Sequence, residues 1–334
     1  MKNRPRSLVA DLLRETSLAR PLWFMRDISE TAVSIITSPV LRRRRYGAAI
    51  LNWHGVTRHF VDPAVEVSHI SSDLFRKQIR HIQKHYHIVS LAKLVTQLEA
   101  GESIPENWVV LTFDDGFRNN LTCAWDILQE TGDIPMTIFI ITDLVSTSNN
   151  HWADLIPMAV MCCHNHTLRV PHLDDSWETR TLQNRRERAN LRFEIIDTIK
   201  SMSEVRRQSV LEEFLSQFGT GELDEIRSRF PSYDYLNWDE VRSMDARGVD
   251  IGSHTCTHAY MRSDLGEERM RDELIRSQEK IRNELGKSPS HFCYPNGGHK
   301  DFCKSSGRIL QEAGYLCGLT TVSGLVMAGN NPLT

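Results

Sequence analysis

The 334-residue sequence lacks the features that are typical of several large classes of protein. Its seven cysteines are few, odd in number and irregularly spaced, so we expect no disulfide scaffold and a reducing compartment fits better. A net charge of −3 argues against a globally basic nucleic-acid binder. No apolar run approaches the roughly 20 residues of a membrane-spanning helix, and charges interrupt the N-terminal segment where a secretory signal would lie. These absences predict a soluble chain, cytoplasmic or peripheral to a membrane.

The rest of the composition is that of a globular protein. Hydrophobic residues make up 40% and charged residues 25% of the chain, which excludes collagen-like and disordered proteins. The charge is uneven, because residues 1–46 hold ten Lys and Arg but only four Asp and Glu, with apolar residues at helical spacing. Such a basic helical N-terminal arm fits an anionic surface, for example a membrane, or else a solvated extension that packs on the body.

Residues 47–334 alternate between short strand patterns and amphipathic helices. Apolar, β-branched runs such as residues 109–113 are typical of parallel strands that are covered on both faces. Helical repeats separate them, including one that Ser72 is expected to cap and one that ends at Gly286. This order predicts an α/β fold with a parallel sheet. Residues of about 152–230 are charged and glycine-poor, and we interpret them as a helical insertion within the domain.

Reactive side chains gather directly after the predicted strands. They are His54, the pair Asp114 and Asp115, the pair His254 and His258, and the turn 294–297. Because the carboxyl ends of parallel strands meet at one face of an α/β fold, we expect these residues to lie close together. Four such clusters at four strand ends are hard to explain by chance.

Two histidines and a carboxylate suggest a metal site. His254 and His258 are four residues apart, a spacing that lets both imidazoles share an ion, and a carboxylate from the Asp114–Asp115 pair completes the set. Two surface histidines and an Asp-Gly turn are the plainer alternatives. Position 255 is Thr rather than a glutamate base, so the base must come from elsewhere, and Asp114 is available.

Three segments in this order, TFDDGF, SHTCTH and FCYPNG, resemble the leading motifs of the polysaccharide deacetylases, the NodB-like proteins of carbohydrate esterase family 4. The resemblance covers roughly residues 48–334. It implies a distorted (β/α)7 barrel. It also implies a metal-dependent hydrolase of carbon–nitrogen bonds other than peptide bonds, which removes N-acetyl groups from a polysaccharide, an oligosaccharide or a lipid-linked sugar.

The resemblance also implies roles for the motif residues. Asp115, His254 and His258 would hold one divalent ion, zinc in the first place, with cobalt, nickel, manganese and iron as alternatives. Asp114 would be the general base that activates a water at this ion. The physical logic agrees, since amide hydrolysis needs a nucleophile at neutral pH and a partner for the developing oxyanion.

The third motif would supply the substrate and oxyanion contacts. The residues concerned are Tyr294, Pro295, Asn296 and Gly297, with a backbone N–H near Tyr294 helping to stabilise the oxyanion. Many members of the family have an arginine that orients the base where this chain has Cys293. The sequence therefore does not show which residue orients the base.

A proton donor for the leaving amine has to be found outside the usual place. The family takes its acid histidine from a motif near the C-terminus, but this chain has no histidine after residue 300. His54, in NWHGV, resembles the first-strand histidine of a subgroup with a Y-H-x-V segment, and we expect it to be the acid. The alternative is a structural histidine that closes the barrel.

The leading hypothesis is thus a metal-dependent glycan N-deacetylase with Asp114 as base and His54 as acid. One alternative is an O-acetyl carbohydrate esterase with the same site, and another is a glycan-binding member of the fold without catalysis. The segment Cys162–His166 is rich in metal-ligating types but lacks the spacing of a zinc site, so we expect none there.

Overall fold

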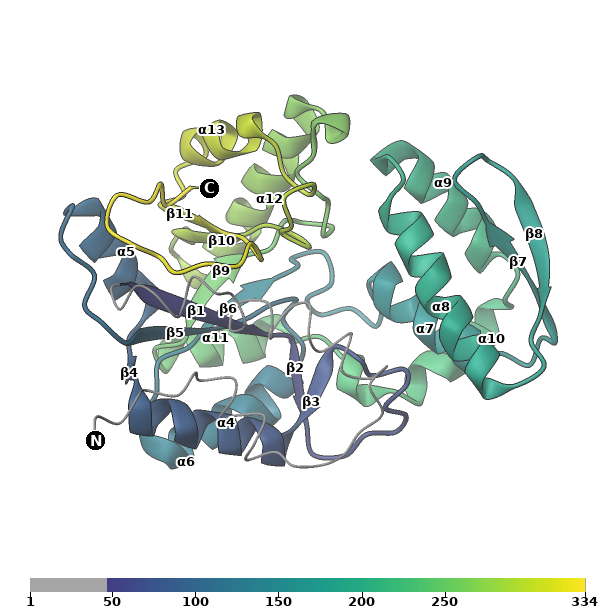
Figure 1. Cartoon of the computed structure of the whole chain (residues 1–334), viewed down its shortest axis with the longest axis horizontal. Helices are drawn as coiled ribbons and strands as arrows, with labels where there is room; N and C mark the ends of the chain where they lie inside the picture. Colours follow the sequence, from purple (N-terminus) through teal and green to yellow (C-terminus); the bar gives the residue numbers. More distant parts are fainter. Residues whose placement is uncertain (1–46, 334) are drawn as a thin grey trace, which may run out of the picture.

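The computed structural model describes residues 47–333, and its centre is a parallel seven-stranded sheet curled into an incomplete barrel (Figure 1). This confirms the predicted α/β barrel class. The strands follow the order β1-β5-β6-β9-β10-β11, with β4 beside the start of β5. Their bounds are β1 Ala48–Trp53, β4 His87–Ile88, β5 Trp108–Phe113, β6 Thr137–Ile140, β9 Asp250–Ser253, β10 His291–Cys293 and β11 Cys317–Leu319.

The pair β1 and β5 lies at one end of the strand order. All six residues of β5 are buried, as expected for a parallel strand covered on both faces. The two strands pair in register from Ala48 opposite Trp108 to Trp53 opposite Phe113. The other edge of β1 is covered by the C-terminal segment, because Ala48 and Val326 exchange two backbone hydrogen bonds of 2.9 Å. The carboxyl ends of the strands therefore meet at one rim.

Helices cover the outside of this sheet (Figure 1). They are α4 Ser72–His85, α5 Leu91–Glu99, α6 Asp126–Gly132, α11 Trp238–Ala246, α12 Glu267–Leu285 and α13 Lys304–Glu312. The cap of α4 lies one residue earlier than predicted, since the Ser71 hydroxyl accepts the Leu74 N–H at 3.2 Å. α12 ends as predicted at Gly286, whose φ of 72° is the left-handed conformation that favours glycine. A short parallel pair, β2 (Gly55–Thr57) and β3 (His69–Ser71), continues from β1.

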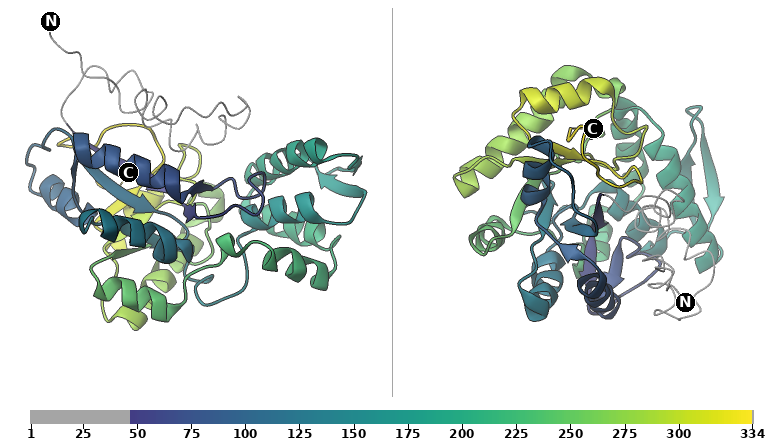
Figure 2. Two further views of the ribbon diagram at one scale, coloured as in Figure 1. Left: turned by 90° about the horizontal axis from the view of Figure 1, so that it is seen from below. Right: turned by 60° about the vertical axis from the view of Figure 1, so that its left-hand side comes forward.

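The insertion forms a second lobe beside the barrel (Figure 2). It consists of α7 Trp152–Cys162, β7 Thr167–Pro171, β8 Trp177–Thr181, α8 Arg185–Lys200, α9 Glu204–Leu215 and α10 Thr220–Ser228. The lobe has its own apolar cluster, which includes Ile156, Leu191 and Phe214. The antiparallel β7–β8 hairpin was not predicted. Only Leu168, Val170 and Pro171 of β7 are buried, so its alternation is too short to stand out among charged helices.

Helix α8 is fixed to the barrel at both ends. Near its start, Arg185 forms an ion pair with Asp62 of the segment between β2 and β3. At its end, the guanidinium of Arg262 donates to the carbonyl oxygen of Lys200 at 3.0 Å. These contacts place α8 along one side of the rim where the strands end.

The basic N-terminal arm lies outside the residues that the structure describes, so its helical prediction is not tested. Within residues 47–333, no helix is both long enough and apolar enough to cross a membrane.

Candidate active site at the carboxyl ends of the strands

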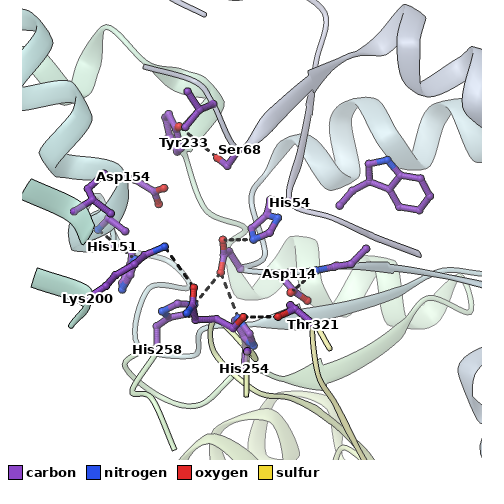
Figure 3. Close-up of a pocket in the computed structure, with 18 of the residues that line it drawn as sticks. His54, Ser68, Asp114, His151, Asp154, Lys200, Tyr233, His254, His258 and Thr321 are labelled. Atoms are coloured by element: carbon purple, nitrogen blue, oxygen red, sulfur yellow. Dashed lines mark hydrogen bonds and ion pairs between the residues drawn. The ribbon is translucent and has the colours of Figure 1, made fainter. Parts of the chain in front are cut away.

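The predicted reactive residues do meet at one rim of the barrel (Figure 3). His54 follows β1, Asp114 and Asp115 follow β5, and His254 follows β9. His258 lies in the loop after His254, and its side chain reaches the same cavity. All five side chains line one cavity of about 490 Å³, a size that suits a small ligand or a sugar unit.

Asp115, His254 and His258 form the predicted metal-ligand set. One carboxylate oxygen of Asp115, Oδ1, lies 3.6 Å from Nε2 of His254 and 3.6 Å from Nε2 of His258. Two ligands about 2.1 Å from a common ion would be separated by roughly this distance. Oδ1 of Asp115 is buried and has no hydrogen-bond partner among the described residues, which a cation would relieve. The donor set therefore fits a divalent metal ion.

A second group of possible ligands fits less well. Asp114, His254 and Cys293 also bring three ligand atoms within 4.8 Å of one another. However, burial raises the pKa of the Cys293 thiol well above its usual value, so the thiolate that metal binding needs is disfavoured. One oxygen of Asp114 is also held by Asn52 at 2.6 Å.

Burial dominates the electrostatics of the ligand set. It raises the pKa of Asp115 to about 7, with the neighbouring His254 opposing the shift and the charge of Asp114 adding to it. It lowers the pKa of His254 and lowers that of His258 well below the usual value. The two imidazoles are thus kept neutral, which is the form that binds a metal.

Two contacts orient the histidines. Nδ1 of His254 lies 2.8 Å from the carbonyl oxygen of Cys293, so Nδ1 carries the proton and Nε2 faces Asp115. The loop between the histidines is held by Glu273 of α12, a fully buried carboxylate. It accepts the backbone N–H groups of Cys256 and Thr257, each at 2.9 Å. Sequence reasoning missed Glu273 because it lies within a charged helical repeat.

Asp114 occupies the position expected of a base. Only 4% of the residue is exposed, and it lines the cavity. Its Oδ2 accepts from Asn52 Nδ2 at 2.6 Å and lies 3.5 Å from the Cys293 sulfur, whereas Oδ1 has no partner within the described chain. Burial raises the pKa of this carboxyl, while His54, Asn52 and Cys293 act in the opposite direction. The side chain at position 293 thus contacts the base, but only as a weak thiol donor.

His54 lies at the open side of the ligand set. Its Nε2 is 3.9 Å from Oδ2 of Asp115, and 31% of its side chain is exposed. Its backbone is held in place because Asn120 Nδ2 donates to the His54 carbonyl oxygen at 2.7 Å. Burial lowers the pKa of this imidazole and the neighbouring Asp114 raises it. The ring therefore faces the cavity rather than closing the barrel beneath the sheet.

The third motif lies beside the site, and one of its backbone donors is already paired. The Tyr294 N–H donates to the carbonyl oxygen of Leu319 at 2.9 Å, as part of the β10–β11 ladder. This N–H is therefore occupied in this conformation, and the oxyanion role of a backbone N–H near Tyr294 stays a prediction. The turn still reaches the site, because Asn296 lines the cavity and accepts from Lys200 Nζ at 3.4 Å. Pro295 and Gly297 shape this turn, with the Gly297 N–H donating to the Pro295 carbonyl oxygen at 2.7 Å.

The insertion supplies the wall opposite the strand ends. The residues of α8 that line the cavity are Arg192, Phe193, Ile196, Asp197 and Lys200. At the start of α7, His151 is buried with its ring centroid 4.2 Å from that of His258, and burial lowers its pKa to about 3. None of these residues was predicted. Their spacing on α8 is helical, but in sequence it looks like an ordinary amphipathic face.

Among the cysteines and histidines of residues 162–166, two have other partners in the insertion. Cys163 is buried and its sulfur lies 3.2 Å from Nη1 of Arg188, and the exposed His164 is 3.6 Å from Glu222. Over residues 47–333, the only groups arranged for a metal ion are the two at the strand ends.

Comparisons with known proteins agree with the fold and the motifs. The polysaccharide deacetylase family model matches residues 101–210 and 218–317, which is more than half of the chain. The poly-beta-1,6-N-acetyl-D-glucosamine N-deacetylase of Escherichia coli K12 is 31% identical over 84 residues, covering 25% of this chain but only 12% of that protein.

Solved structures share the architecture at low sequence identity. IcaB from Ammonifex degensii has a TM-score of 0.54 and 16% identity, over 86% of this chain and 89% of its own. The Streptococcus pyogenes deacetylase PplD in complex with acetate has a TM-score of 0.53 and 17% identity, over 87% and 90% of the two chains.

A curled parallel sheet with carboxylates and imidazoles at its strand ends places the chain in the α/β barrel class. Together with the matching family model, it establishes that the chain belongs to the polysaccharide deacetylase family.

Proposed function

We propose that the protein is a metal-dependent hydrolase that removes N-acetyl groups from a glycan. The observation that carries this proposal is the convergence of a ligand set, a base and an acid in one cavity. The Asp115 carboxylate lies 3.6 Å from Nε2 of both His254 and His258, and Asp114 and His54 line the same space. The partial likeness to the E. coli poly-N-acetylglucosamine deacetylase supports an N-acetylglucosamine unit as the substrate.

The ligand set would hold one divalent ion, for which zinc is our first choice. When bound, the ion supplies Lewis acidity that polarises the acetyl carbonyl and lowers the pKa of water. Two neutral imidazoles and one carboxylate are a common catalytic zinc set, and they leave coordination positions open.

The remaining steps are proton transfers by the chain's own side chains. Asp114 accepts a proton from the attacking water through its unpartnered Oδ1 as the water oxygen bonds to the carbonyl carbon. His54 then gives a proton to the glycan nitrogen as the C–N bond breaks, so that acetate and a free amine are formed. This role needs the imidazolium form, which burial disfavours by lowering the pKa of His54 and which the neighbouring carboxylate of Asp114 favours.

The test combines metal analysis with acetate release from matched N-acetyl and O-acetyl sugars. We expect one equivalent of divalent metal and release from the N-acetyl substrates. Asp114→Asn should keep the metal but lower kcat by about 10²–10⁴-fold, because it removes the base and not a ligand. Release from O-acetyl sugars alone would indicate an esterase. A metal-free, inactive protein that still binds glycan would indicate a non-catalytic role.

A further inference from the structure

Asp114 has two oxygens in contrasting surroundings. Oδ2 accepts the Asn52 amide at 2.6 Å and contacts the Cys293 sulfur at 3.5 Å. Oδ1 is buried, belongs to a residue that lines the cavity, and has no partner in the described part of the chain. A carboxylate anchored by one oxygen presents the lone pairs of the other in a fixed direction.

Strand register places Asn52 beside the base. Asn52 lies opposite Thr112 in the parallel β1–β5 ladder, and Asp114 is two residues beyond Thr112. Because side chains alternate along a strand, Thr112 and Asp114 point to the same face of the sheet. The amide of Asn52 therefore meets the base across the strand pair rather than by a loop that can move.

The orientation of the Asn52 amide is determined by its neighbours. Its Oδ1 lies 3.2 Å from the Thr112 hydroxyl, which is also 3.2 Å from the carbonyl oxygen of Leu51. A flipped amide would bring Oδ1 within 2.6 Å of the ionised Asp114, so that two acceptors would face each other. Nδ2 must therefore face the base, with Thr112 on the far side of the amide.

We propose that Asn52 is the positioning residue of the base, acting with Thr112 to hold Asp114 so that Oδ1 points into the cavity. This inference rests on the proposed function, since it assumes that Asp114 takes a proton during hydrolysis. A neutral amide donor orients the carboxylate without placing a second full charge beside the metal ligands. Cys293 offers only a weak S–H donor, so it is expected to contribute less.

The experiment is a double-mutant cycle on the metal-loaded, full-length protein with an N-acetyl sugar substrate. Asn52→Leu keeps a similar shape and should lower kcat about ten- to a hundredfold, with KM and metal stoichiometry nearly unchanged, as expected for losing a charge-assisted hydrogen bond. In the Asp114→Asn background the same change should cost less than about twofold, because the group it positions is gone.

Controls separate positioning from packing. Thr112→Val should lower kcat by a smaller factor, whereas Thr137→Val, a buried threonine on β6 that bonds Asp250, should not. Equal losses for Asn52→Leu with and without Asp114, or a loss of metal in Asn52→Leu, would overturn the assignment.

A failure of the proposed function would be visible separately. If the wild type releases no acetate from any substrate, the Asn52–Asp114 coupling is measured from the unfolding equilibria of the four metal-free proteins. Non-additivity of at least about twofold in the unfolding constant is expected for a direct buried contact. Additive values would show that the two side chains do not interact, and would overturn the inference.

Discussion

The two walls of the cavity differ in how well their residues can be recognised from a short stretch of sequence. The strand wall is built from short segments in which a buried strand delivers reactive residues at its end, as β5 delivers Asp114 and Asp115. The insertion wall is one face of α8, whose residues Phe193, Ile196 and Lys200 are spaced by three and four positions. The first wall carries chemistry that tolerates few residue types. The second shapes the space in front of it.

The metal ligands should show the largest effect on the strand wall. His258→Ala removes one of three ligands, and we expect loss of most bound metal and of acetate release while the barrel stays folded. Metal content and circular dichroism would be measured together. His164→Ala, which changes an exposed histidine of the insertion, serves as the matched control. Full metal occupancy in His258→Ala would show that the ligand set is assigned wrongly.

The acid role of His54 predicts a dependence on the leaving group. His54→Ala should slow amide substrates by about 10²–10⁴-fold, since an amine departs only with a proton. An activated acetyl ester, whose leaving group needs no proton, should be slowed much less. Rates on both substrates and metal content would be measured. Equal losses on the amide and the ester would leave the acid unidentified.

The insertion wall should respond more weakly. Lys200→Met keeps the length of the side chain but removes its contact with Asn296, which spans the cavity from α8 to the third motif. We expect KM for the glycan to rise about two- to tenfold, the usual worth of one hydrogen bond, with a smaller change in kcat. Lys280→Met, which breaks an ion pair with Asp143 on another face, is the control. A loss in kcat alone would indicate that Lys200 acts in the chemical step and not in binding the glycan.

What the sequence could predict follows the same division. The strand ends and the candidate ligands and base beside them could be located, because their residue types suit that chemistry and lie next to a clear strand pattern. The contacts that support them could not. Asn52 reaches Asp114 only through the β1–β5 register, and Glu273 reaches the histidine loop only through the packing of α12. The occupied N–H of Tyr294 likewise depends on the β10–β11 ladder, which no local pattern reveals.

The smallest expected effect concerns a contact between β3 of the barrel and the segment that follows the insertion. His69 of β3 is buried, and its Nε2 lies 2.8 Å from the carbonyl oxygen of Ser232, just beyond the insertion. Burial lowers the pKa of His69 to about 3, although the contact with Ser232 opposes this. In the unfolded chain the pKa is about 6.5. The unfolded state therefore binds the proton first as the pH falls.

Stability should consequently be complete above about pH 6.5 and decline as the pH falls toward 3. The part due to His69 should be on the order of 1–2 kcal/mol between pH 7 and pH 5. His69→Gln keeps an amide donor toward Ser232 but cannot titrate, so its unfolding free energy should fall less over this range. Activity at pH 7 should stay close to that of the wild type, because His69 does not line the cavity. Parallel curves of unfolding free energy against pH for the two proteins would show that His69 does not contribute to the pH dependence of stability.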